Sequence, residues 1–103
     1  MDQSSQQKLQ TLLESILGSK NVYFQPPEGM NLSYPAIVYK LEESDTAFAD
    51  GLPYKMHDRY QVQYIDRSPV SQVVRKIQQY PMTRFTSYFV ADGLNHYNYA
   101  MYF

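Results

Sequence analysis

The stretch YFVADGLNHYNYAMYF, residues 88–103, decides the fold class, because it forms two apolar runs around a tight turn. Asp92-Gly93 lies between the runs, and Asp-Gly accepts the positive φ angles that a two-residue hairpin requires. We therefore predict a β-hairpin with strands over 83–90 and 94–103. In the second strand, alternation predicts one face made of Tyr97, Tyr99, Met101 and Phe103 and another made of His96, Asn98, Ala100 and Tyr102.

Two segments have the periodicity of amphipathic helices. Over residues 5–17 an apolar stripe recurs every three or four positions, and Gly18 follows as a stop. A second helix is predicted to begin at Ser68 as N-cap, with Pro69 at its first position, and to end before Pro81. Its stripe is Val70, Val73, Val74 and Ile77.

Three further segments are β-prone: a short run at 22–24, then 34–41 and the long, alternating 54–65. The acidic stretch 42–53 between the last two is predicted to be a loop. The string Ala-Asp-Gly-Leu at 49–52 recurs at 91–94 and is consistent with two similar turns.

The order of these elements predicts an α+β fold: an antiparallel β-sheet of about four strands with two amphipathic helices packed on one face. A length of 103 residues fits a single domain spanning 1–103. Charged residues make up 18% and aromatic residues 16% of the chain, eleven of them Tyr. This excess of Tyr favours extensive half-buried surface or a protein interface.

Several functional classes have little support in the composition. The net charge of -1 and the absence of a basic cluster argue against nucleic-acid binding, and the absence of Cys excludes a thiolate nucleophile. No apolar run approaches the roughly 20 residues that span a bilayer, so we expect no membrane partner. We also expect no catalytic residue, cofactor or metal. An enzyme using the acidic segment with His57 or His96 remains an alternative, although no HExxH or GxSxG motif is present.

Three stretches carry a resemblance to a known group of proteins: YPAIVY at 34–39, YQVQYIDRSPVS at 60–71 and the stretch at 88–103. Together they resemble tail terminator and tail completion (minor capsid-type) proteins of long-tailed bacteriophages and prophages of Gram-positive bacteria. The resemblance covers roughly residues 20–103.

The resemblance implies a structural virion protein without enzymatic activity, assembled in the host cytoplasm and carried in the tail or neck. Its homo-oligomeric ring, a hexamer in this group, would cap the major tail tube protein and join it to the head-closure or connector protein. DNA would be only passing cargo, and the acidic segment 42–53 would face the lumen. The residues expected at interfaces are Phe48, Asp50, Lys55, His57, Arg59, Tyr102 and Phe103.

Two other functions stay open at this point. Head-closure or stopper proteins and other head-tail connector rings are also small and lack catalytic motifs, but a stopper would more readily form a small β-barrel without two amphipathic helices. A non-phage intracellular protein-binding module would also account for the aromatic, weakly charged surface.

Overall fold

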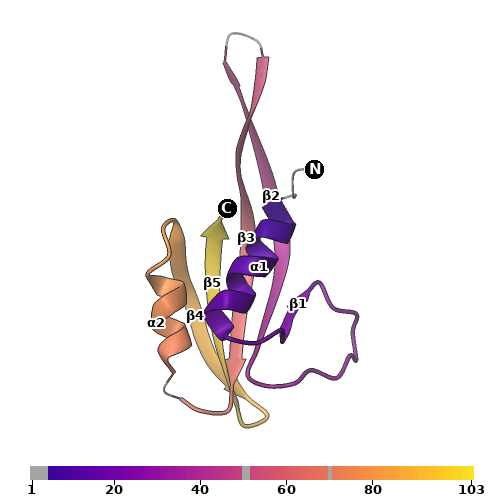
Figure 1. Cartoon of the computed structure of the whole chain (residues 1–103), viewed down its shortest axis with the longest axis vertical. Helices are drawn as coiled ribbons and strands as arrows, with labels where there is room; N and C mark the ends of the chain where they lie inside the picture. Colours follow the sequence, from indigo (N-terminus) through magenta and orange to yellow (C-terminus); the bar gives the residue numbers. More distant parts are fainter. Residues whose placement is uncertain (1–4, 50–51, 70) are drawn as a thin grey trace.

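The computed structural model describes residues 5–49, 52–69 and 71–103, and for 43–49 and 52–57 it describes the backbone alone. The molecule is elongated, with principal extents of 52 × 26 × 24 Å. Its lower part is a sheet with two helices, and a two-stranded arm projects from it (Figure 1).

The fold is α+β, as predicted, with two helices and one five-stranded mixed sheet. The elements are α1 (Ser5–Leu17), β1 (Val22–Phe24), β2 (Ala36–Ala49), β3 (Leu52–Asp66), α2 (Gln72–Gln78), β4 (Thr83–Ala91) and β5 (Leu94–Tyr102). The strand order is β1-β2-β3-β5-β4. Every pair is antiparallel except β1 with β2, because the connection over 25–35 returns the chain to run in the same direction. The predicted antiparallel sheet of about four strands is therefore extended by one short parallel strand.

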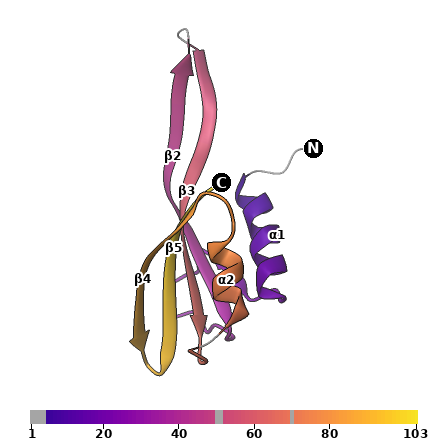
Figure 2. The ribbon, with the colours of Figure 1, turned by 90° about the vertical axis from the view of Figure 1, so that its left-hand side faces the viewer.

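Both helices lie on the same face of the sheet, which Figure 2 shows edge-on. They bury the alternating apolar residues of the strands, and Leu9, Leu13 and Ile77 are their fully buried contributions. The sheet contributes Ile37, Tyr39, Tyr60, Val62, Tyr64, Tyr99 and Met101. Much of this core is Tyr, and helix α1 supplies polar partners for it: the Tyr39 hydroxyl accepts from Gln6 Nε2 at 2.7 Å and donates to Gln10 Oε1 at 2.5 Å.

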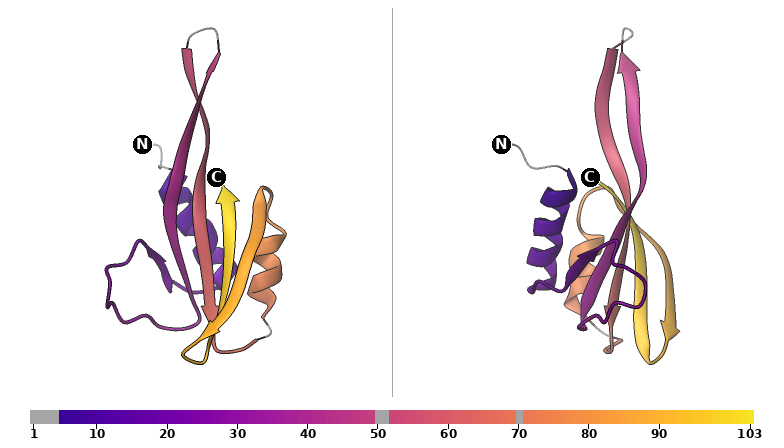
Figure 3. Two further views of the ribbon diagram at one scale, coloured as in Figure 1. Left: turned by 180° about the vertical axis from the view of Figure 1, so that it is seen from behind. Right: turned by 90° about the vertical axis from the view of Figure 1, so that its right-hand side faces the viewer.

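The β4–β5 hairpin confirms the turn predicted from Asp92-Gly93. Asp92 has φ 53° and Gly93 has φ 74°, so both residues adopt the left-handed conformation. Residues 97, 99 and 101 face the helices, as the alternation predicted, and residues 96, 98 and 100 lie on the opposite face. Figure 3 shows that neither α1 nor α2 covers this opposite face.

The predicted loop at 42–53 is wrong. Strands β2 and β3 continue through it and pair as far as Ala49 with Leu52, forming a long hairpin arm beyond the sheet. The register shifts between Leu41 and Glu43 and again between Ser44 and Thr46. A two-stranded arm has water on both sides, so its residues need no apolar alternation, and the segment therefore looked like a loop.

The predicted start of the second helix is also wrong. Ser71 is the N-cap, and its Oγ accepts from the backbone N–H of Val73 at 3.1 Å. The backbone N–H of Ser68 instead donates to Asp66 Oδ1 at 3.0 Å in a turn. Ser71 is selected because its hydroxyl also lies 2.8 Å from the Tyr64 hydroxyl, which ties the cap to the sheet.

Candidate interaction surfaces

Three of the predicted interface residues have their backbone in the strands of the arm. The backbone of Phe48 lies in β2, and the backbones of Lys55 and His57 lie in β3. Their side chains, and the whole of Asp50, lie outside the described residues. The arm places this segment of the chain away from the helices (Figure 1), while the interface role of these four residues stays a prediction.

Arg59 and Tyr102 are brought together at the base of the arm. They are register partners on β3 and β5, on the open face of the sheet, and the guanidinium carbon lies 6.0 Å from the centre of the Tyr102 ring. Arg59 Nε also lies 3.1 Å from Glu42 Oε2, an ion pair without the angular geometry of a hydrogen bond. Both side chains are about one-third exposed, at 38% and 33%, so the pair contributes about 0–1 kcal/mol.

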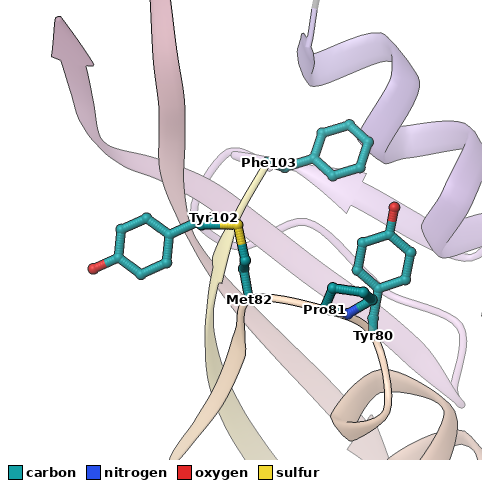
Figure 4. A pocket seen from close by; sticks show the side chains of 5 residues that line it. All are labelled: Tyr80, Pro81, Met82, Tyr102 and Phe103. Atoms are coloured by element: carbon teal, nitrogen blue, oxygen red, sulfur yellow. The ribbon is translucent and has the colours of Figure 1, made fainter. Parts of the chain in front are cut away.

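Phe103 points to the opposite side of the chain from Tyr102 (Figure 4). Its ring centre lies 6.2 Å from that of Tyr80, and it packs against the core of its own domain. Its backbone N–H donates to the carbonyl of Asp58 at 2.8 Å, which continues the sheet pairing past β5. The sequence grouped Tyr102 and Phe103 as one interface, but in the structure Phe103 is largely a packing residue.

A shallow pocket of about 360 Å³ lies where these residues meet. It is lined by Tyr80, Pro81, Met82, Tyr102 and Phe103 (Figure 4). The lining is mostly apolar, and Met82 is 54% exposed. The pocket is therefore suited to an apolar group, and it lies next to the Arg59–Tyr102 pair.

Half of the exposed large apolar side chains among those the structure describes lie on strand β4, which sequence reasoning did not select. Four residues are strongly exposed: Phe85, Tyr88 and Phe89 at 45% each, and Val90 at 59%. Within the described residues, β4 has a strand neighbour on one side only. A sequence signal was present, because the apolar residues Tyr88, Phe89 and Val90 are consecutive and must therefore lie on both faces of the strand. In a strand with one solvent-exposed face, apolar and polar residues alternate instead.

The open face of the central strands carries a connected set of polar side chains. Gln63 Nε2 donates to Asn98 Oδ1 at 2.9 Å, and Asn98 Nδ2 donates to Ser87 Oγ at 3.0 Å. This ladder of amides and hydroxyls crosses three strands and leaves Asn98 only 5% exposed. Among the side chains that the structure describes, exposed apolar groups therefore gather at the β4 edge, and the centre of the open face has few of them.

The buried tyrosines have perturbed ionisation. Burial, with the nearby Asp66 carboxylate, raises the pKa of Tyr64, whose hydroxyl donates to Asp66 Oδ2. Burial likewise raises the pKa of Tyr99 to about 12, and its hydroxyl has no hydrogen-bond partner among the residues that the structure describes. These groups are 1% and 0% exposed, so they are held neutral inside the core and not presented to a substrate.

Few arrangements in the described part of the chain would support metal or acid–base chemistry. No group of three or more His, Asp or Glu side chains there is placed to hold a metal ion. The His96 ring stacks on Phe89 with ring centres 4.5 Å apart and planes at 7°. None of the described helices is long and apolar enough to cross a membrane.

Comparison of the chain with family models, with curated proteins and with solved structures found no significant match.

Proposed function

We propose that this protein is a structural virion protein, the tail terminator of a long-tailed bacteriophage or prophage. Copies assemble into a closed ring, a hexamer, which caps the major tail tube protein and joins it to the head-closure or connector protein. The sequence resemblance at 34–39, 60–71 and 88–103 supports this specific role. The fold supports the more general one, that of a protein built to contact other proteins.

One observation carries the proposal: the sheet has two different open edges. At one edge is β4, with its exposed aromatic residues, and at the other is the projecting half of β2, beyond the short strand β1. A closed ring needs a heterologous contact, in which one surface of each subunit meets a different surface of the next. Two dissimilar edges on opposite sides of the domain satisfy that requirement.

The fold also favours a terminator over a stopper ring. Two amphipathic helices cover one face of an open sheet, whereas a stopper was expected to be a small β-barrel. The enzymatic alternative uses the acidic segment with His57 or His96. The side chains of 43–57 lie outside the described residues, and the His96 ring stacks on Phe89. Replacing His57 and His96 together by Gln tests that alternative: assembly should persist, whereas a catalytic role requires complete loss of function.

Electron microscopy of purified protein mixed with tail tubes tests the proposed function directly. The expected result is a ring of protein at one end of each tube, and tubes that no longer lengthen when tube subunits are added. Added connector protein should then bind at the capped end. Tubes that lengthen unchanged, with no density at either end, would refute the terminator role; binding to the connector alone would favour the head-closure alternative.

A further inference from the structure

We propose that the exposed edge strand β4 is covered by the arm of a second copy of this chain, so that the acidic β2 half of one arm pairs with the β4 edge of its neighbour. This inference rests on the proposed ring and names the contact that closes it. Three features of the structure converge on it: an open apolar edge, an open projecting edge and complementary charge.

The β4 edge has the properties of a docking strand. It runs for nine residues from Thr83 to Ala91, and the part from Ser87 onward pairs with β5 in an unbroken register. Protein edges exposed to water are usually short or protected by Lys or Pro, and β4 contains neither residue. Its one irregularity, a register shift between Phe85 and Ser87, leaves the aromatic residues after it on a regular strand.

The arm offers the second edge. Strand β1 pairs with only the inner end of β2, at Ile37, Val38 and Tyr39. Just beyond those positions the backbone N–H of Leu41 donates to Gln25 Oε1 at 3.2 Å. Past Leu41, β2 continues to Ala49 with β3 as its neighbour, so its outer backbone edge is open there within the described residues. A strand pair of this kind extends a neighbouring sheet by β-augmentation, in which main-chain hydrogen bonds provide affinity.

The charges of the two surfaces are opposite. Residues 42–50 contain four acidic residues and no basic one, whereas 67–91, which include α2 and β4, contain four basic residues and no acidic one. The basic residues are Arg67, Arg75, Lys76 and Arg84, and all four are exposed. Complementary charge steers association and selects the register of a contact. A contact of arm with arm, or of β4 with β4, would instead bring like charges together.

This contact gives the acidic segment a different place from the one that the resemblance implied. The segment was expected to line the lumen, where negative charge prevents DNA from adhering. Pairing with the basic flank of a neighbour uses the same charges for assembly. The exposed apolar groups of β4 are then buried in the same contact.

Charge exchange tests the contact. The arm variant combines Glu43→Lys with Asp45→Lys. The flank variant, in the basic segment 67–91, combines Arg75→Glu with Arg84→Glu. Sedimentation velocity at a series of concentrations measures the self-association of each. We expect each variant alone to associate about tenfold more weakly or worse than the unmodified chain. A 1:1 mixture should recover, because an arm carrying Lys meets a flank carrying Glu, and the unmodified arm meets the unmodified flank. Lys8→Glu with Lys20→Glu, on the α1 side, is the matched control and should associate normally.

Disulfide trapping gives an independent readout, since the chain contains no Cys. Two strands separate β2 from β4 within one copy, so Thr46→Cys and Thr86→Cys meet only between copies. Oxidation of a mixture of the two single variants should give the mixed dimer, and Thr11→Cys in place of Thr46→Cys should not.

The outcomes separate this contact from the ring itself. Rings that assemble equally well in all the charge variants, without the mixed disulfide, would overturn the contact and leave the terminator role intact. The contact is also overturned if the unmodified chain stays monomeric at every concentration and the two Cys variants form no mixed disulfide; the terminator role is then judged by the tube-end experiment.

Discussion

Two buried tyrosines of the same core should respond in opposite ways to removal of the hydroxyl group. Tyr64 and Tyr99 are 1% and 0% exposed and both face the helices. The Tyr64 hydroxyl interacts with Asp66 and Ser71, whereas the Tyr99 hydroxyl is buried without a partner. Replacement by Phe removes one oxygen and little volume, so the comparison isolates hydrogen bonding.

The expected magnitudes follow from those partners. Tyr64→Phe removes a hydrogen bond to a carboxylate and one to the cap of α2, which together stabilise the fold by about 2–3 kcal/mol. Tyr99→Phe removes a desolvated hydroxyl with no compensating bond, so the free energy of unfolding should stay unchanged or rise by up to about 1 kcal/mol. For a domain of this size, about 1 kcal/mol shifts Tm by roughly 4–8 °C.

Alkaline pH gives the same comparison a second readout. The pKa of Tyr99 is raised to about 12 in the folded chain, against about 10 in the unfolded chain. Between these values the unfolded chain releases the proton and the folded chain keeps it, so stability falls as pH rises, by about 2 kcal/mol at pH 12. Tyr99→Phe should remove this part of the decline.

Urea unfolding followed by circular dichroism at pH 7, and again from pH 9 to 12, measures both effects. The expected order of stability at pH 7 is Tyr99→Phe equal to or above the unmodified chain, and Tyr64→Phe clearly below it. A loss of more than about 1 kcal/mol in Tyr99→Phe would refute the reasoning, because it would mean that the hydroxyl has a partner in solution.

Three other substitutions test the turn, the cap and the last residues. Gly93→Ala should cost about 1 kcal/mol in urea unfolding, since φ is 74° and no neighbouring atom lies within 4 Å, so the cost is conformational. Ser71→Ala should lower stability by about 1 kcal/mol through loss of the N-cap, while the control Ser15→Ala on exposed α1 surface should not. Phe103→Ala should lower Tm, because the lost packing is worth about 1–3 kcal/mol of stability. Tyr102→Ala should lower stability by under about 1 kcal/mol. The opposite order would contradict the assignment of Phe103 to the core and Tyr102 to the open face.

Local patterns were sufficient wherever a residue's role depends on its neighbours in sequence. The apolar stripe at 5–17 predicted α1 with its observed bounds, and Asp92-Gly93 predicted the turn that both positive φ angles confirm. The alternation in 94–103 identified which side chains enter the core. These features depend on periodicity and on turn conformation, which the sequence displays directly.

Other features depended on contacts between distant segments, and sequence reasoning failed there. Ser71 replaces Ser68 as the cap because it reaches the hydroxyl of Tyr64, seven positions earlier on a neighbouring strand. The alternation placed Tyr102 and Phe103 on opposite faces, yet both were expected at an interface; the packing of Phe103 against Tyr80 shows that Phe103 is covered by its own domain.

The sequence by itself determined the fold class, the existence of two helices and the β4–β5 hairpin, because these follow from local spacing. The tertiary structure alone decided that the acidic segment extends as an arm and that β4 lies at an edge with its aromatic residues exposed. Strand order and edge position arise from pairing between residues far apart in the chain. A strand has the same sequence pattern whether its outer side meets a neighbour or water, so the surface available to a partner emerges only when the sheet is assembled.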